Sequence, residues 1–289
     1  MRALLILLAI VSAFALVAFG IVKVCRKNFR VRVAGEVTQL LASEADSVGW
    51  DRVRARWSEL PEPVKRYMRY AITPGTPAMR TVHTTHGGTF RPWPGSQWMP
   101  TEGEEWFTVG RPGFVWHASV RIAPGVWFGV RDRLLEGKGE VLASIEWVAP
   151  VVDSKGTGLS QGSLMRWLAE TTWFPYALLG DDVKWLPLDD HSAVAMLTDG
   201  DQSVRLTFAI DDEGKITSVS AERWYEPDNG MHTWRAYLRD YQLMAGCRVP
   251  TDTEVTWVLD DGEYSYARFK LTAMEPNPDP AASVAHLRR

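Results

Sequence analysis

The sequence predicts a mainly antiparallel α+β fold, in which a curved half-barrel sheet holds one central helix and N-terminal helices come first. Three observations predict it. An uncharged apolar segment opens the chain, apolar residues alternate with period two from about residue 79, and one helix-like block interrupts that alternation at residues 162–179. Tight turns between alternating segments are typical of antiparallel strands, because parallel strands need long crossover connections.

The first segment has the length and composition of a transmembrane helix. No charged residue occurs from Ala3 to Val22, and about 20 apolar residues in a helix span a hydrocarbon core of roughly 30 Å. A cleaved signal peptide is the alternative, because Ala13-Phe14-Ala15 resembles a cleavage site. The apolar run continues past that site, which favours a retained transmembrane anchor over residues 1–27.

The charges that flank this segment predict its orientation. Arg2 precedes it, whereas five basic residues follow it: Lys23, Arg26, Lys27, Arg30 and Arg32. The side richer in Lys and Arg is usually cytoplasmic. We therefore expect a single-pass protein of the cell membrane with a cytoplasmic soluble domain; an extracytoplasmic domain is the alternative. The same basic flank makes membrane lipid an expected partner.

Residues 28–77 are expected to form a helical preface. Apolar residues recur at helical spacing within residues 28–48, 51–60 and 64–71. Proline-rich sequences interrupt the pattern after Leu60 and end it at residues 74–77.

Residues 78–275 are expected to form the β-rich half-barrel domain. About ten segments alternate or are rich in β-branched and aromatic residues; apart from the stretch around residues 81–90, they are 114–122, 126–130, 141–147, 194–198, 204–210, 216–226, 232–243, 247–259 and 264–274. In the interrupting block, Leu164, Trp167, Leu168 and Thr171 follow helical spacing, with Ser163 as the expected N-cap. Residues 276–289 are expected to be an extended, flexible tail.

Composition limits the function. A formal charge of −3 and a pI near 6.1 do not indicate a nucleic-acid partner. Two cysteines imply neither a disulfide framework nor a cysteine zinc site. The 14 tryptophans leave two interpretations open, which are ordinary packing in a β domain and an aromatic-lined apolar cavity.

Several short stretches resemble an uncharacterised bacterial family, a domain of unknown function usually preceded by membrane-spanning sequence. They are Leu60-Pro61-Glu62-Pro63-Val64, Pro112-Gly113-Phe114-Val115-Trp116, Leu164-Met165-Arg166-Trp167-Leu168-Ala169-Glu170 with Trp173-Phe174-Pro175, Arg248-Val249-Pro250-Thr251 and Glu254-Val255-Thr256-Trp257. The resemblance covers residues 58–275 and implies no activity. The order of elements is also weakly similar to the lipoprotein-carrier fold of LolA and LolB. That likeness implies an apolar cavity for acyl chains, and such carriers work outside the cytoplasmic membrane.

Candidate catalytic and metal motifs each have an ordinary structural interpretation. Gly158-Leu159-Ser160-Gln161-Gly162 has the spelling of a nucleophile elbow but lacks the strand that must precede it. His83 and His86 lie on an expected strand, where this spacing directs them to opposite faces. Residues 102–105 are expected to be a solvated acidic loop, and Arg166 with Glu170 an intrahelical pair. No catalytic residue, metal or cofactor is predicted.

The leading hypothesis is a membrane-anchored protein that binds a hydrophobic ligand, a lipid or acyl chain, in an aromatic-lined half-barrel. The predicted ligand-binding residues are Trp116, Arg166, Trp167, Glu170, Trp173, Phe174, Trp185 and Trp257. The aromatic side chains would line the cavity, and Arg166 or Glu170 would orient the ligand. The alternatives are a structural or interaction module at the membrane, whose protein partner the sequence does not indicate, and an enzyme, which is not favoured.

Overall fold

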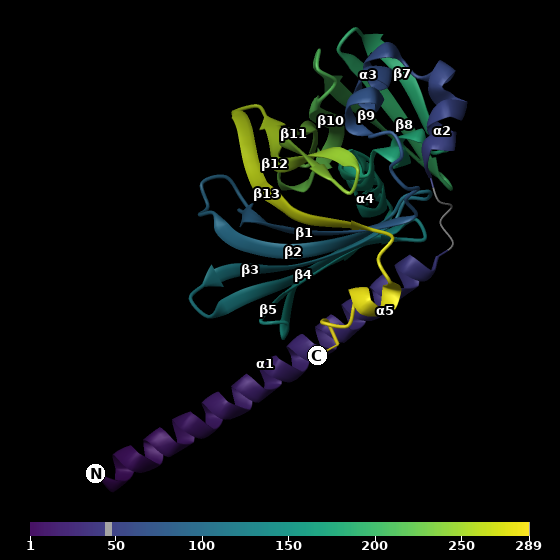
Figure 1. Cartoon of the computed structure of the whole chain (residues 1–289). Coiled ribbons are helices and arrows are strands. Elements are labelled where there is room, and N and C mark those ends of the chain that lie inside the picture. Colours follow the sequence, from purple (N-terminus) through teal and green to yellow (C-terminus); the bar gives the residue numbers. More distant parts are fainter. Residues whose placement is uncertain (44–47, 289) are drawn as a thin grey trace.

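One antiparallel sheet of 13 strands forms the framework of the structure, a computed structural model that describes residues 1–43 and 48–288 (Figure 1). The strands are β1 (Thr81–Phe90), β2 (Met99–Thr108), β3 (Phe114–Ala123), β4 (Val126–Leu135), β5 (Lys138–Ile145), β6 (Ala149–Lys155), β7 (Val183–Asp189), β8 (Ser192–Asp199), β9 (Gln202–Ile210), β10 (Ile216–Tyr225), β11 (Gly230–Met244), β12 (Cys247–Leu259) and β13 (Gly262–Pro276). Their spatial order is β6-β5-β4-β3-β2-β1-β13-β12-β11-β10-β9-β8-β7. Two meanders therefore meet where β1 pairs with β13.

The connection between the two meanders runs across the curved sheet. Because β6 and β7 are opposite edges of the sheet, the chain must cross one face to pass from one to the other. Helix α4 (Thr157–Glu170) makes this crossing, followed by the 3₁₀ turns η2 (Thr171–Trp173) and η3 (Pro175–Leu179), and it contacts both β5 and β9. The predicted half-barrel with one central helix is confirmed, and Figure 1 shows α4 between the two flaring halves.

Helix α1 (Arg2–Ala42) packs on the other face of the sheet. Its second half buries Val33, Val37 and Leu40 against β2 and β3. Neighbouring residues of β2 point to opposite faces, because side chains alternate along a strand. Trp106 accordingly packs with α1, whereas Phe107 packs in the larger core beside α4.

The first half of α1 projects from the domain as an exposed apolar rod. This helix is long and apolar enough to cross a membrane, and its most apolar 18-residue window is 0% buried. The anchor and the start of the helical preface are one continuous helix as far as Ala42. Residues 44–47, at the end of the range expected for that preface helix, lie outside the described residues.

Two short helices complete the preface. Helix α2 (Trp50–Arg56) continues into a 3₁₀ turn, η1 (Trp57–Glu59), and α3 (Glu62–Ala71) follows. Helix α3 contacts β8, β9 and β12, and it buries Val64, Tyr67 and Met68 in the larger core.

The C-terminal segment differs from the extended, flexible tail that the sequence predicts. It contains a short helix, α5 (Pro280–Ser283), and buries Val284 and Leu287 in the cluster formed by α1 and β2. The indole N–H of Trp106 donates to the hydroxyl of Ser283 at 2.6 Å. The prolines of this segment prevent a long helix. The two apolar residues that follow them, Val284 and Leu287, nevertheless pack against α1 and β2.

The structure also corrects three local predictions. The acidic residues 102–105 lie in β2 rather than in a solvated loop. The central helix starts at Thr157, so Ser163 is inside it and not its N-cap. Edge strands β6 and β7 were not predicted, because β6 is exposed throughout and β7 contains Pro187.

Candidate functional site

A large groove lies between the two free edges of the sheet. It has a volume of about 1530 Å³, and segments from both halves of the molecule line it. Its lining includes Gly162 and Met165 of α4, Val152 of β6, Leu186 of β7 and Trp257 of β12. Ligand pockets for small molecules usually measure roughly 300–1,000 Å³, so this groove has room for a larger ligand.

Large apolar side chains are exposed along this groove. Leu186, Leu188, Trp224 and Met231 are between 50% and 60% exposed, and all four line it. Single exposed apolar residues are ordinary, but several that line one groove favour an interaction site.

Four of the predicted aromatic residues lie in the core and not at the groove. Trp167, Trp173, Phe174 and Trp185 are each at most 8% exposed. The indole N–H groups donate to backbone carbonyls: that of Trp167 to Thr108, that of Trp173 to Pro250 and that of Trp185 to Leu178. These side chains fill the space between α4, its 3₁₀ turns and the sheet. Of the eight predicted residues, Trp257 is the one that lines the groove.

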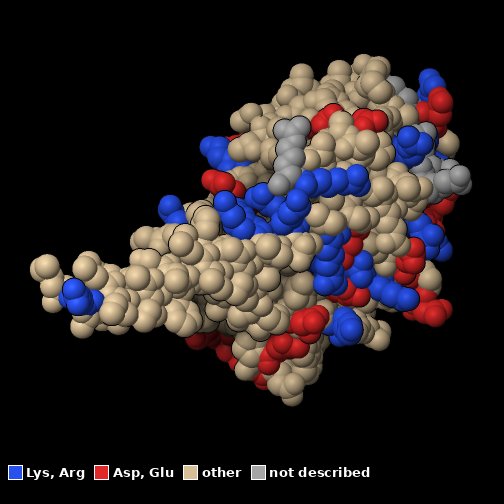
Figure 2. All heavy atoms as spheres, turned by 90° about the horizontal axis from the view of Figure 1, so that it is seen from below, with Lys and Arg blue, Asp and Glu red and all other residues tan. Residues whose placement is uncertain are grey.

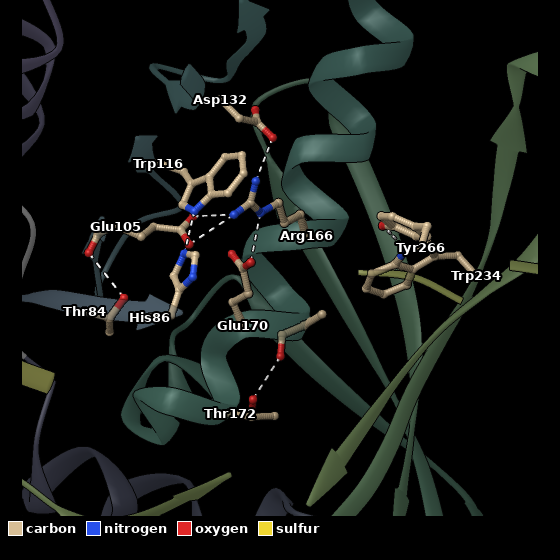
Figure 3. A network of polar contacts seen from close by, with 11 residues as sticks. Thr84, His86, Glu105, Trp116, Asp132, Arg166, Glu170, Thr172, Trp234 and Tyr266 are labelled. Carbon is tan, nitrogen blue, oxygen red and sulfur yellow. Dashed lines mark hydrogen bonds and ion pairs between the residues drawn. The ribbon is translucent and has the colours of Figure 1, made fainter. Parts of the chain in front are cut away.

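The predicted polar residues form part of a largely buried charge cluster, in which Glu105 is fully buried and the other side chains are 16–20% exposed (Figure 3). We define the carboxylate cluster as Arg166 and Glu170 of α4, Glu105 of β2 and Asp132 of β4. Arg166 donates through Nη2 to both carboxylate oxygens of Glu105, at 2.9 and 3.0 Å. Its Nη1 lies 2.7 Å from Asp132 Oδ2, and its Nε lies 2.8 Å from Glu170 Oε1. One guanidinium therefore pairs with three carboxylates, through all three of its nitrogen atoms.

Burial controls the ionisation of this cluster. Glu105 is 1% exposed, and burial raises its pKa well above the usual value although Arg166 opposes the shift. Burial likewise raises the pKa of Glu170 and of Asp132. Burial acts to lower the pKa of Arg166, but the three carboxylates outweigh it and raise that pKa. Arg166 therefore remains charged, while the carboxylates compete for protons.

Trp116 joins this cluster to a buried histidine. Its ring lies beneath the Arg166 guanidinium at 5.0 Å, and its indole N–H donates to His86 Nε2 at 2.7 Å. Burial lowers the pKa of His86 to about 3, so its imidazole is neutral near pH 7. His83 instead stacks on Trp106 on the face that carries α1. The two histidines thus occupy opposite faces, as the strand spacing predicts.

Three charged residues of this region, Glu105, Asp132 and Arg223, were not among the predicted ligand-binding residues. The sequence suggested a solvated loop for Glu105, whereas it lies in β2. The position of Glu105 could have been predicted from β2. Glu105 is two residues from Phe107, so both side chains point to the same face of the sheet, and Phe107 is in the core. Nothing in the sequence brings Asp132 and Arg223 near α4, because they come from strands in different meanders.

The other candidate motifs have structural roles. Ser160 lies inside α4, where its hydroxyl donates to the carbonyl of Gly156 and accepts from the N–H of Gly139. It is therefore not at the strand-to-helix turn that a nucleophile elbow requires. Within residues 1–43 and 48–288, no group of three or more His, Cys, Asp and Glu side chains could hold a metal ion.

Charge is arranged around the base of the exposed helix. Figure 2 shows the projecting apolar part of α1 as a tan arm, with blue Lys and Arg atoms gathered where it meets the body of the molecule. Lys23, Arg26, Lys27 and Arg30 occur along this part of α1. The Arg26 guanidinium lies over the Trp147 ring, 4.4 Å from its centroid, which fixes α1 to the turn between β5 and β6.

Comparison with known proteins gives a family match and weak structural similarities. A family model, described as a family of unknown function (DUF6544), matches residues 52–269. No curated protein matches the chain.

Among solved structures, similar chains include a LolA superfamily protein from Nitrosomonas europaea (12% identity, TM-score 0.39, 76% of this chain and 94% of that chain). Another is a putative outer membrane lipoprotein-sorting protein domain from Vibrio parahaemolyticus (9%, 0.41, 83% and 97%). A third is a DUF1329 family protein from Desulfovibrio piger (10%, 0.40, 77% and 98%).

Proposed function

We propose that this chain, which belongs to the family of unknown function, binds a hydrophobic ligand, a lipid or acyl chain, beside a membrane. Membership of the family supplies no activity, so the proposal rests on the groove. The observation that carries the proposal is the coincidence of a groove of about 1530 Å³ with exposed Leu186, Leu188, Trp224 and Met231. Covering apolar surface releases about 25 cal/mol per Å², so an acyl chain lying on these side chains would bind favourably.

The binding surface that we propose is not the predicted aromatic cavity. The tryptophans of α4 and η2 fill the concave face, and the ligand would lie outside them, along the groove. Val152 and Leu186 belong to the edge strands β6 and β7, and both line the groove. The groove is therefore open along the gap that the sheet leaves between its edges.

The membrane supplies the ligand in this proposal, and α1 holds the groove near it. The exposed apolar half of α1 has the length of a membrane span, and its buried half is packed on the sheet. Trp147, which contacts Arg26 of α1, directly precedes the exposed Val148. Tryptophan and arginine are both typical of the membrane interface.

Photo-crosslinking of the full-length chain in nanodiscs tests the proposal. The probe is a long-chain fatty acid with a photoreactive group near its end, and cross-linked peptides are identified by mass spectrometry. We expect labelling in peptides that contain Leu186, Leu188 or Met231. Leu188→Asp should reduce the labelling at least several-fold, because a charge in an apolar contact is costly.

A matched substitution provides the control. Leu243 is 64% exposed, like Leu188 at 60%, but it does not line the groove. Leu243→Asp should therefore leave the labelling unchanged. Equal labelling of both variants, or labelling confined to α1, would contradict the proposal.

A protein partner is the second candidate, and the exposed sheet edges favour it. β6 is exposed along its whole length, and Val151 at 51% is exposed there. Unpaired edges of this kind can add a strand from another chain. If this is the function, the fatty-acid probe will not label the groove, and cross-links from β6 will lead to a protein instead.

A further inference from the structure

Arg223 is placed to recognise the polar end of a ligand in this groove. It lies on β10, two residues after the buried Ala221 and four after the buried Val219. Because side chains alternate along a strand, the side chain of Arg223 points to the same concave face as theirs. It also lines the groove. A Cβ atom added at Gly162 of α4 would lie 2.9 Å from its Nη2, so the guanidinium sits between β10 and the helix.

Aromatic rings hold the guanidinium in this position. It lies 5.0 Å from the centroid of Trp234 and 5.8 Å from that of Trp257. Trp234 is itself fixed, since it is 4% exposed and its indole N–H donates to the hydroxyl of Tyr266 at 3.0 Å (Figure 3). A guanidinium over aromatic faces loses little freedom when it forms hydrogen bonds.

The guanidinium of Arg223 faces aromatic rings. Within residues 1–43 and 48–288, it takes part in no ion pair and its side chain donates no hydrogen bond. Its neighbour Glu222 instead accepts from the hydroxyl of Thr233 at 2.6 Å. The Arg223 side chain is only partly exposed, and burial lowers its pKa. Such a cation is stabilised by an anion that brings hydrogen-bond acceptors.

We infer that Arg223 binds the carboxylate of a long-chain fatty acid whose chain lies along the apolar rim of the groove. This inference rests on the proposed function and adds the class of the head group. One guanidinium without a partner matches one negative charge. The carboxylate cluster acts on Arg223 through space: Asp132 and Glu170 favour its charge, and Arg166 opposes it. One guanidinium balances a singly charged carboxylate, whereas a doubly charged phosphate would bring excess negative charge next to this cluster.

The experiment compares probes that differ in the head group alone. Full-length protein in nanodiscs of neutral lipid is exposed to a photoreactive fatty acid, to the alcohol of the same chain and to the corresponding phosphate monoester. We expect the fatty acid to label the groove about ten- to a hundredfold more efficiently than the alcohol, the range for hydrogen bonds to a charged group. Arg223→Gln should abolish this preference, so that the fatty acid and the alcohol label the groove with similar efficiency.

Two further variants separate recognition from folding and from general charge. Arg223→Lys keeps the charge and should retain part of the preference, although it loses the bidentate geometry. Arg205 also lines the groove but is exposed, so Arg205→Gln removes the same charge and should retain the full preference.

The outcomes distinguish this inference from the proposed function. If no probe labels the groove, the proposed function fails. If fatty acid and alcohol label it equally, or if Arg223→Gln keeps the preference, binding stands and the role of Arg223 is overturned. Stronger labelling by the phosphate monoester would overturn the assignment to a carboxylate.

Discussion

At the scale of single residues, the carboxylate cluster combines three acidic side chains with one arginine inside the protein. If all were ionised, Arg166 would balance one of three negative charges. Removing one partner of a buried charge network usually destabilises a protein by about 3–5 kcal/mol, whereas replacing the whole network by apolar residues can be neutral. The cluster therefore fixes how α4 sits on β2 and β4 more than it adds net stability.

This cluster should make stability depend on pH. Burial raises the pKa of Glu105 and Glu170, so the native state binds protons more tightly than the unfolded state. Below the unfolded-state value near 4.5, both states are protonated and the stability is fully present. As the pH rises through the folded-state pKa, this stability is lost, by about 1.4 kcal/mol for each unit of pKa shift.

The variant Glu170→Gln should weaken this dependence. Glutamine keeps the shape of a protonated glutamate and cannot ionise, so we expect the melting temperature to fall less between pH 5 and pH 8 than in the unmodified protein. Thermal unfolding of the full-length chain in detergent measures this. Glu263→Gln is the control, because Glu263 is 43% exposed and paired at the surface. A pH dependence that is identical in all three proteins would contradict the expectation.

At the scale of elements, α1 has two halves with different environments. The first half is exposed and apolar, while the second half buries Val33, Val37 and Leu40 against the sheet. The ion pairs of Glu36 with Arg131 and Arg133, both at 3.3 Å, add polar contacts to this packing. Because one continuous helix carries both halves, the orientation of the sheet relative to the exposed apolar half is set by α1 and not by a flexible linker.

A matched pair of substitutions on α1 tests this coupling. Val37 is fully buried, whereas Val31 is 47% exposed on the same helix. Val37→Asp should destabilise the protein by about 3 kcal/mol or more, since it removes a buried valine and leaves a charge without a partner. Val31→Asp should change the unfolding free energy by less than about 0.5 kcal/mol. Denaturant unfolding monitored by tryptophan fluorescence compares them, and equal effects would show that α1 does not pack on the sheet.

At the scale of the whole molecule, the sheet remains open because α4 and its aromatic side chains occupy the concave face. The two edges β6 and β7 cannot meet across that helix, and the gap between them is the groove. The same crossing that joins the two meanders thus keeps the proposed binding surface accessible.

The charges that flank the apolar part of α1 predict on which side of a membrane the domain would lie. The basic residues after the apolar span predict a cytoplasmic domain. A fluorescent protein that matures only in the cytoplasm, fused to the C-terminus of the full-length chain, should therefore fluoresce. An alkaline phosphatase fusion at the same position should be inactive, because that enzyme needs an oxidising compartment. The reverse pattern would place the domain outside the cytoplasm.

Much of the fold could be predicted because it follows local rules. Alternation predicted most strands, helical spacing predicted the helices α1 to α4, and short turns predicted antiparallel pairing. The predictions were wrong where local and tertiary preferences differ: the tail is packed, and Glu105 is buried rather than solvated. The number of strands was also too low, since β2, β6 and β7 contain charged, exposed or proline residues that weaken the alternation.

The sequence by itself determined the apolar N-terminal helix, the antiparallel sheet with one central helix, and the family, because each depends on residues close together along the chain. Tertiary structure alone decided what the tryptophans do and where a ligand could lie. A buried tryptophan and a cavity-lining tryptophan have the same local sequence, and their difference depends on what α4 covers. The carboxylate cluster and the position of Arg223 likewise arise from strands that are distant in sequence and meet only when α4 crosses the sheet.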